Sequence, residues 1–263
     1  MNKIKISKIM IHNWEEPCIS GKNGTYAIFF AGCNLKCVFC QNYKISTSNV
    51  GEEKTVEEFA EILLSSGDAH NIDLVSPSLY IPQIAEALKI AKKQGLKKPV
   101  IYNTNSYESS EKLKLLDGLV DVYLPDLKYF SNEISIKYSN AKNYFPIATE
   151  AILEMHRQQP IAAFDENGII QKGIILRHLC LPGNLEDTKN VLDWIKNNLP
   201  AETYVSLMSQ YVPEYNASKF PEINRKLTLR EYNNVVEYFL NIGLKNGFIQ
   251  ELESSNKKYI PEF

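Results

Sequence analysis

The sequence predicts a single α/β domain built as a partial TIM barrel of (β/α)6 type. Short apolar runs alternate along the chain with amphipathic helical patterns, which is typical of parallel strands joined by right-handed crossovers. No internal repeat, low-complexity tract or Gly/Ser linker interrupts this alternation. About six β–α units are too few to close an eight-stranded barrel, so we expect an open one whose site lies at the carboxyl ends of the strands.

The predicted strands are short runs rich in β-branched residues, and several are apolar throughout because helices would cover both faces of the sheet. These runs are Thr25–Ala31, Ile72–Val75, Pro99–Asn103, Val120–Leu124, Gly173–His178, Thr203–Met208 and Gly247–Gln250. Residues 1–24 are expected to pack on the barrel, and residues 245–263 to supply a last strand and a tail. The whole chain, 1–263, is therefore expected to form one domain.

Capping signals mark several predicted helices. A threonine precedes a glutamate by three positions at Thr55–Glu58 and again at Thr228–Glu231, and each pair fits a capping box. Asn184 is expected to cap another helix with its side chain. The region Ser131–Gln159 is expected to be helical, with a break near Pro146.

Composition and charge exclude several classes of protein. The 29 basic and 31 acidic residues give a net charge of −2, which offers no electrostatic argument for nucleic acid or an anionic membrane as partner. No run approaches the roughly 20 apolar residues of a membrane span, and the first residues do not resemble a signal peptide. We therefore expect a soluble, cytoplasmic protein. The five cysteines are an odd number, which argues against a disulfide framework.

Three of these cysteines form a candidate metal-binding motif directly after the first predicted strand. Cys33, Cys37 and Cys40 have the spacing C-x3-C-x2-C. Three thiolates on one loop suit three irons of a cubane cluster, and the fourth iron is then left without a protein ligand. An open coordination position on a metal centre is where a cofactor or substrate binds. The sequence therefore favours a catalytic iron–sulfur site.

Two alternatives for the cysteines stay open. A structural zinc site would need a fourth ligand in addition to the three cysteines. Four residues are candidates for it, although none has a paired ligand spacing: His12, Cys18, His178 and Cys180. The other alternative is that the three cysteines are simply unpaired thiols. His178 itself can be a site residue or a hydrogen-bonded core histidine, because it points opposite to Arg177 in an alternating strand.

With Phe39 before the last cysteine, the pattern C-x3-C-x-aromatic-C resembles the radical SAM superfamily. The resemblance implies a [4Fe–4S] cluster on Cys33, Cys37 and Cys40, with the amine and carboxylate of S-adenosylmethionine (SAM) on its open iron. It further implies an oxidoreductase that cleaves SAM reductively to a 5′-deoxyadenosyl radical. That radical then abstracts a hydrogen atom from a substrate.

Further segments resemble the branch of this superfamily that is similar to pyruvate formate-lyase-activating enzymes. They are His12–Gly21, Cys40–Tyr43, Leu181–Asn184, Met208–Tyr211 and Phe220–Arg225. The resemblance implies a glycyl radical enzyme as protein substrate and an electron donor such as flavodoxin or ferredoxin. Two alternatives remain, a radical SAM enzyme acting on a small molecule or peptide, and a non-catalytic iron–sulfur protein.

The resemblance also implies a set of SAM-binding residues. Those that match the family are Phe39, Asn42, Asp126, Lys128 and Arg177. Other positions depart from it and are neutral here. Ser76 and Ser78 stand where the superfamily has Gly-Gly-Glu, Asn103 and Asn105 lie in Asn-Thr-Asn-Ser instead of Asp-Thr-Asn-Gly, and Gln210 replaces a histidine. A serine does not balance the charge of the SAM ammonium group.

Overall fold

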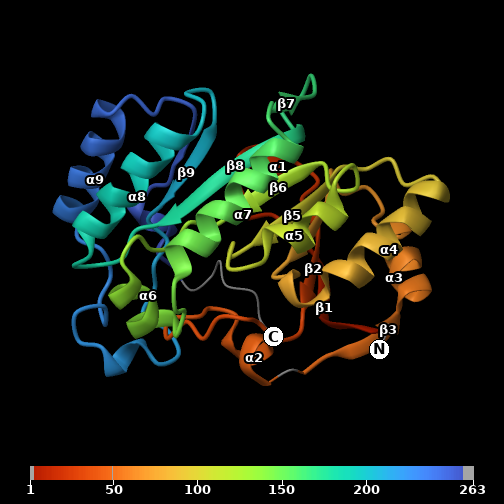
Figure 1. The fold of residues 1–263 in the computed structure, drawn as a ribbon, viewed down its shortest axis with the longest axis horizontal. Helices are drawn as coiled ribbons and strands as arrows, with labels where there is room; N and C mark the ends of the chain where they lie inside the picture. Colours follow the sequence, from red (N-terminus) through yellow and green to blue (C-terminus); the bar gives the residue numbers. More distant parts are fainter. Residues whose placement is uncertain (1–2, 49, 257–263) are drawn as a thin grey trace.

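The structure is a computed structural model that describes residues 3–48 and 50–256. The described residues form a ten-stranded sheet with the order β10-β9-β8-β6-β5-β4-β2-β1-β3, and β7 pairs with β8 beside it (Figure 1). The strands are β1 (Lys3–His12), β2 (Thr25–Phe30), β3 (Glu52–Thr55), β4 (Ile72–Val75), β5 (Val100–Thr104), β6 (Val122–Pro125), β7 (Ala163–Phe164), β8 (Ile170–Leu179), β9 (Tyr204–Met208) and β10 (Gly247–Ile249).

The central strands confirm the predicted partial barrel. From β2 through β4, β5, β6, β8 and β9 to β10, neighbouring strands pair in parallel. The order of strands has two ends, at β10 and β3, so the barrel is open. Every residue of β4, β5 and β6 is buried, as expected of parallel strands that are covered on both faces. Each predicted strand is present in the sheet.

The helices cover the outside of the sheet. They are α1 (Pro17–Ser20), α2 (Tyr43–Ser48), α3 (Val56–Leu64), α4 (Ile81–Lys93), α5 (Ser110–Leu113), α6 (Asn132–Ser139), α7 (Tyr144–Gln158), α8 (Leu185–Asn198) and α9 (Leu229–Asn241). Short 3-10 turns lie at η1 (Ser78–Tyr80), η2 (Lys114–Leu116), η3 (Ala217–Lys219) and η4 (Leu252–Ser254). Figure 1 shows α3 and α4 together toward one end of the sheet and α8 and α9 toward the other.

Two of the three predicted caps are confirmed. Thr55 and Thr228 each accept a hydrogen bond from the backbone of the glutamate three positions on, and that glutamate bonds back to the threonine N–H. The helix α8 begins after Asn184 as predicted, but the prediction that the Asn184 side chain caps it is wrong. Its amide instead donates to the carbonyl of Pro182 at 2.7 Å, which tightens the preceding loop.

The predicted break near Pro146 is also wrong in its position. The helical region 131–159 divides into α6 and α7 between Asn140 and Asn143, both of which adopt the left-handed conformation with φ of 51° and 56°. Asparagine tolerates this conformation better than most residues. Pro146 lies in the first turn of α7, where the backbone N–H groups have no helical partner, so proline removes no hydrogen bond there.

The N-terminal segment extends the sheet, which the sequence analysis did not predict. β1 pairs antiparallel with β2 on one side and with β3 on the other. The chain then continues through residues 13–16 into α1, which brings Glu15 toward the carboxyl end of the central strands. Residues 1–2 and 257–263, at the ends of the predicted N-terminal segment and C-terminal tail, lie outside the described residues.

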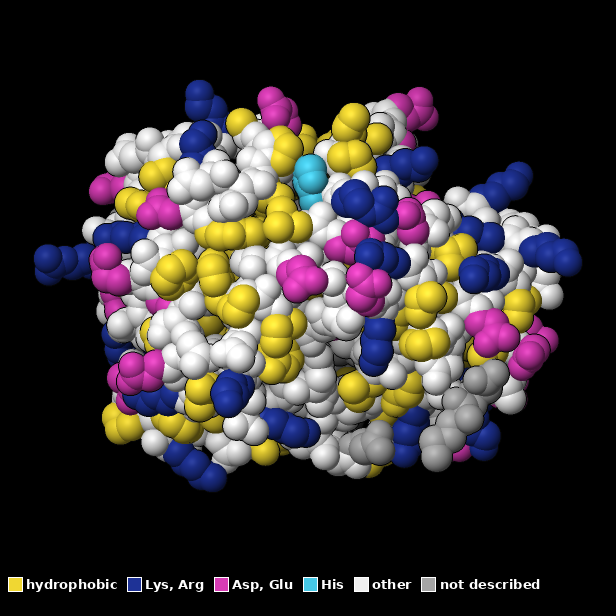
Figure 2. Space-filling model, viewed as in Figure 1, with side chains coloured by type: hydrophobic (Ala, Val, Ile, Leu, Met, Phe, Trp, Pro, Cys, Tyr) yellow, Lys and Arg dark blue, Asp and Glu magenta, His cyan; other side chains and the backbone are white. Residues whose placement is uncertain are grey.

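The surface carries no strong bias toward one sign of charge on the face that is shown. Figure 2 shows Lys and Arg side chains interspersed with Asp and Glu. Such mixed charge does not create the continuous positive field that attracts nucleic acid. Within the described ranges, no helix has both the length and the apolar character that crossing a bilayer requires.

Candidate active site

A cavity of about 230 Å³ lies at the carboxyl ends of the central strands, where the sequence predicted the site. β4, β5, β6, β8 and β9 each contribute a residue within or directly after the strand, and the cysteine loop after β2 supplies the opposite wall. All predicted site residues except Ser78 line it. They are Cys33, Cys37, Phe39, Cys40, Asn42, Ser76, Asn103, Asn105, Asp126, Lys128, Arg177 and Gln210. The Ser78 hydroxyl instead lies 3.3 Å from Oγ1 of Thr104.

Backbone hydrogen bonds from two sides fix the cysteine loop. Lys36 and Val38 donate to the carbonyls of Ser139 and Tyr138, at 3.0 and 2.8 Å, and so attach the loop to the end of α6. On the other side Asn216 donates to Val38 at 2.8 Å. The ring of Phe39 packs edge-on against Tyr211, with centroids 5.5 Å apart. The loop is therefore held in place by the protein itself.

Each cysteine sulfur has a polar neighbour. Ser139 donates to Sγ of Cys37 at 3.0 Å, Asn105 lies 3.5 Å from Sγ of Cys33, and Ser46 lies 3.4 Å from Sγ of Cys40. Burial raises the pKa of Cys37 to about 12 and also raises the pKa of Cys40. Thiolates in such surroundings need a positive centre beside them, so the donor set fits a metal–sulfur group.

The geometry does not favour the zinc alternative. Across the described residues, no three Cys, His, Asp or Glu side chains come close enough together to hold a single metal ion. Cys18 and Cys180 are buried and do not line the cavity. Of the four candidate fourth ligands, only His12 lines the cavity together with the cysteines.

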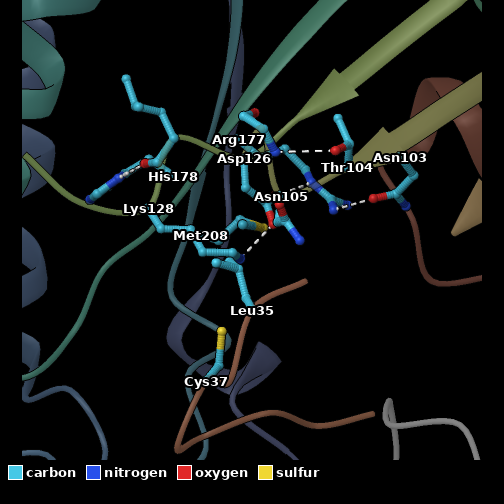
Figure 3. A network of polar contacts seen from close by, with 12 residues as sticks. Leu35, Cys37, Asn103, Thr104, Asn105, Asp126, Lys128, Arg177, His178 and Met208 are labelled. Carbon is cyan, nitrogen blue, oxygen red and sulfur yellow. Dashed lines mark hydrogen bonds and ion pairs between the residues drawn. The ribbon is translucent and has the colours of Figure 1, made fainter. Parts of the chain in front are cut away.

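Arg177 is the centre of a largely buried polar network facing the cysteines (Figure 3). Its guanidinium donates to Oδ1 of Asp126 at 3.0 Å, to Oε2 of Glu15 at 2.9 Å and to Oδ1 of Asn103 at 2.6 Å. Lys128 donates to the other oxygen of Asp126 at 2.6 Å. Figure 3 shows the Lys128 side chain reaching Asp126, with Cys37 below it on the cysteine loop. The network thus places two cations between the strands and the cysteine loop.

Burial raises the pKa of the acids in this network, and the neighbouring charges either oppose this effect or add to it. Burial alone would raise the pKa of Asp126, but Lys128 and Arg177 beside it hold that pKa below its usual range. Burial raises the pKa of Glu15 in spite of its ion pair with Arg177. Asp73 is completely buried, and burial and then the charge of Glu15 raise its pKa well above normal. The cavity therefore holds Asp126 as an ionised carboxylate.

The hydroxyl of Tyr144 joins two strand ends behind the network. It lies 2.9 Å from both the carbonyl of Asn105 after β5 and the carbonyl of Asp126 after β6, and it accepts a hydrogen bond from the N–H of Lys128 at 3.0 Å. Tyr144 comes from the first turn of α7. This helix therefore fixes the separation of the two strand ends that carry site residues.

The sequence analysis missed several residues of this site. Glu15 lines the cavity, and Asp73 accepts a hydrogen bond from Asn103 at 3.2 Å. Asp73 had a usable signal, since it is an acid within the otherwise apolar run Ile72–Val75. Glu15 lies within the segment His12–Gly21 that carries part of the family resemblance, but nothing in the sequence placed its side chain in the cavity. Tyr144 had no signal, because the course of the chain from β6 to α7 depends on tertiary packing.

His178 is a core residue. Its Nδ1 lies 2.7 Å from the carbonyl of Leu127, its Nε2 lies 3.0 Å from the Thr188 hydroxyl, and the residue is 1% exposed. Figure 3 shows it turned away from Arg177, as strand alternation requires. Of the two possibilities left open by the sequence, the structure supports the hydrogen-bonded core histidine.

His178 is expected to make the protein less stable in mild acid. Burial lowers its pKa to about 4, whereas an unfolded histidine titrates near about 6.5. The unfolded chain therefore binds a proton first, and stability is lost as the pH falls from about 6.5 to about 4, by about 3 kcal/mol. We expect this loss to be absent from His178→Asn, which keeps a donor for Leu127. The free energy of unfolding, measured between pH 7 and pH 4 for both proteins, checks this; parallel profiles would contradict it.

Known proteins are similar to this chain in sequence and in fold. The family model of the radical SAM superfamily matches residues 27–195. An uncharacterised protein of Methanocaldococcus jannaschii is 36% identical over 226 residues, which are 81% of this chain and 61% of that protein. The pyruvate formate-lyase-activating enzyme of Listeria monocytogenes is 23% identical over 184 residues, which are 66% of this chain and 68% of the enzyme.

A solved structure agrees with the fold. The crystal structure of Streptococcus suis SuiB bound to S-adenosylmethionine matches with a TM-score of 0.55 and 18% identity, over 84% of this chain and 48% of SuiB. At that identity the likeness concerns the fold alone. The chain spans less than two thirds of the length of SuiB and of the archaeal relative. The family model covers well over half of the chain, and the cysteine loop lies within the matched residues. The chain therefore belongs to the radical SAM superfamily.

Proposed function

We propose that this chain is an enzyme that binds a [4Fe–4S] cluster through Cys33, Cys37 and Cys40 and cleaves SAM reductively. The observation that carries the proposal is that all three cysteines line the same cavity as Asp126 and Arg177 at the carboxyl ends of the strands. Members of the superfamily typically use such a cluster together with SAM. When bound, the reduced cluster supplies the electron that breaks the sulfonium C–S bond of SAM and releases the 5′-deoxyadenosyl radical.

The residues of the cavity orient SAM and screen its charges. Arg177 is held on three sides, so its guanidinium is fixed before a ligand arrives and lies where a carboxylate would bind. Lys128 opposes part of the burial penalty on the Cys37 thiolate. Asn42 and Asn105 line the wall next to the cysteines and offer neutral donors and acceptors to SAM.

The remaining predicted SAM contacts are neutral side chains. Ser76, Asn103 and Gln210 line the cavity, and Ser78 stands behind Thr104. Phe39 and Tyr211 form an aromatic pair on the same wall. An apolar wall of this kind keeps water away from a reactive radical. These neutral residues therefore shape the cavity and exclude water from it, while the charged residues bind SAM.

The substrate we propose is a glycyl radical enzyme, from which the radical would take a hydrogen atom. Support comes from the pyruvate formate-lyase-activating enzyme of Listeria, with which this chain shares 23% identity over 66% of its length. A flavodoxin or ferredoxin would supply the electron. A small molecule or peptide is the second candidate substrate, because the neutral residues Ser76, Asn103 and Gln210 distinguish this cavity from the pattern of the activating enzymes.

Formation of 5′-deoxyadenosine tests the proposed reaction. The protein is reconstituted anaerobically with iron and sulfide, reduced with dithionite and incubated with SAM. We expect 5′-deoxyadenosine and methionine to accumulate, and neither to form without dithionite. A protein that assembles the cluster but neither binds nor cleaves SAM would refute the proposal and indicate an iron–sulfur protein with another role.

A further inference from the structure

The hydroxyl of Ser139 makes a short polar contact to one of the three cysteine sulfurs. Its Oγ lies 3.0 Å from Sγ of Cys37, whereas the hydrogen-bonding neighbours of Cys33 and Cys40 lie at 3.4 Å or more. Ser139 is the last residue of α6 and is completely buried. A cysteine that binds a metal is a thiolate, which accepts hydrogen bonds and cannot donate them. The Ser139 hydroxyl therefore directs its proton to the sulfur of a cluster ligand.

A second buried hydroxyl lies behind Ser139. Oη of Tyr129, a residue that follows β6 and is 1% exposed, lies 2.6 Å from Oγ of Ser139. A serine hydroxyl has one proton, so when Ser139 donates to Cys37 the phenol of Tyr129 must donate to Ser139. The Tyr129 ring packs edge-on against Tyr144, with centroids 5.4 Å apart, which fixes the phenol. The two hydroxyls thus form a donor chain that ends on the sulfur, and each hydrogen bond in such a chain strengthens the next.

The backbone holds this donor chain against the cysteine loop. The carbonyl of Ser139 accepts a hydrogen bond from the N–H of Lys36, the residue before Cys37, at 3.0 Å. Asn140 ends the helix in the left-handed conformation, and its N–H donates to the carbonyl of Ile136 at 3.0 Å. Ser139 therefore contacts the loop twice, through its carbonyl and through its hydroxyl, so the donor is in position at the sulfur before a metal binds.

We propose that Ser139, supported by Tyr129, raises the reduction potential of the cluster by donating a hydrogen bond to the sulfur of Cys37. The inference rests on the proposed function and adds two residues to it that do not line the cavity. Reduction adds one electron, taken from the external electron donor, and so places more negative charge on the sulfurs. A hydrogen bond to a ligand sulfur is therefore stronger in the reduced state than in the oxidised state. The donor chain makes reduction more favourable, and no proton is transferred.

The midpoint potential of the reconstituted holoenzyme tests this role. It is measured anaerobically and without SAM, by redox titration followed through the electron paramagnetic resonance signal of the reduced cluster. We expect Ser139→Ala to lower the equilibrium constant for reduction about tenfold, because it removes a hydrogen bond to a charged acceptor. For one electron this is a fall of about 59 mV in the midpoint potential. Tyr129→Phe keeps the ring but removes the donor behind Ser139, so we expect a smaller fall, about threefold in the same constant.

Ser135→Ala is the matched control. Ser135 is also a completely buried serine of α6, but its hydroxyl donates to the carbonyls of Asn132 and Ala141 and not to a sulfur. We expect this variant to keep the wild-type potential. The sign of the shift separates a lost hydrogen bond from a loosened loop, because water that reaches the cluster stabilises its more negative, reduced state and raises the potential. An unchanged or raised potential in Ser139→Ala would overturn the proposal.

Tyr129→Phe also covers the case in which Ser139→Ala does not fold or loses its cluster, as judged by circular dichroism and iron content. An unchanged potential in Tyr129→Phe would then refute the donor chain. A wild-type protein that assembles the cluster but does not cleave SAM refutes the proposed function alone, because the potential is measured without SAM. A wild-type protein that assembles no cluster refutes both the proposed function and the role of Ser139.

Discussion

Replacing Cys37 with alanine is expected to remove the cluster, from about four iron atoms per chain to less than about one, and to abolish 5′-deoxyadenosine formation. Cys37 lies between Cys33 and Cys40 on one loop, and its sulfur faces the cavity below Lys128 (Figure 3). Without it two thiolates remain, and a cubane then lacks half of its usual cysteine ligands. Iron and sulfide analysis of the reconstituted variant, together with its visible absorption, measures the loss.

Cys18→Ala is the matched control for this experiment. Cys18 resembles Cys37 in that burial raises its pKa to about 12, but it lies in α1 and does not line the cavity. Its side chain packs with Ile101 and Val122. We expect the control to keep its iron and its activity. A full cluster and normal SAM cleavage in Cys37→Ala would show that the site has been assigned to the wrong loop.

Replacing Arg177 with methionine is expected to destabilise the protein by about 3–5 kcal/mol. Methionine has a similar length but leaves Asp126, Glu15 and Asn103 without their shared donor. Breaking a buried ion pair from one side costs this much because an uncompensated charge stays buried. The expected loss corresponds to a fall in the thermal midpoint of about 6–20 °C. Thermal unfolding of the cluster-free protein measures it without interference from iron.

Arg157→Met tests whether the burial of the ion pairs causes the destabilisation expected for Arg177→Met. Arg157 also pairs with two acids, Asp117 and Glu154, but its side chain is 55% exposed. Exposed ion pairs contribute little to stability because water and salt screen them. We expect a much smaller fall in the thermal midpoint than for Arg177→Met. Similar falls for the two variants would contradict the buried network as the source of the stability.

The strands could be predicted where both faces of the sheet are covered. Runs such as Ile72–Val75 are largely apolar, and the alternation of such runs with helical patterns identified the partial barrel. β1 and β3 were missed because they carry lysines and glutamates at one edge of the sheet, although the alternation Lys3-Ile4-Lys5-Ile6 is a strand signal. The break between α6 and α7 was misplaced because proline is a stronger sequence signal than two left-handed asparagines.

The site could be predicted where it lies on a motif or at a strand end. The spacing of the cysteines located one wall, and the polar residues within or directly after β5, β6 and β8 located the other. The hydrogen bonds and ion pairs of these residues could not be predicted, because they depend on contacts between distant segments. The resemblance implied a role for Arg177 in SAM binding but not its partners within the protein, and the structure shows it bound to Asp126, Glu15 and Asn103.

The ion pair between Glu15 and Arg177 has a consequence for biosynthesis. It joins residues that are 162 positions apart, one between β1 and α1 and the other in β8. At a translation rate of about 5–20 residues per second, roughly 8–32 s separate the synthesis of the two residues. During that interval β1, β2, β4, β5 and β6 can pair in chain order, while Glu15, Asp73 and Asp126 still lack their arginine. The nascent chain therefore makes the part of the sheet from β1 to β6 before its cofactor pocket is complete, and it passes through a stage at which that part of the pocket is acidic and open to water.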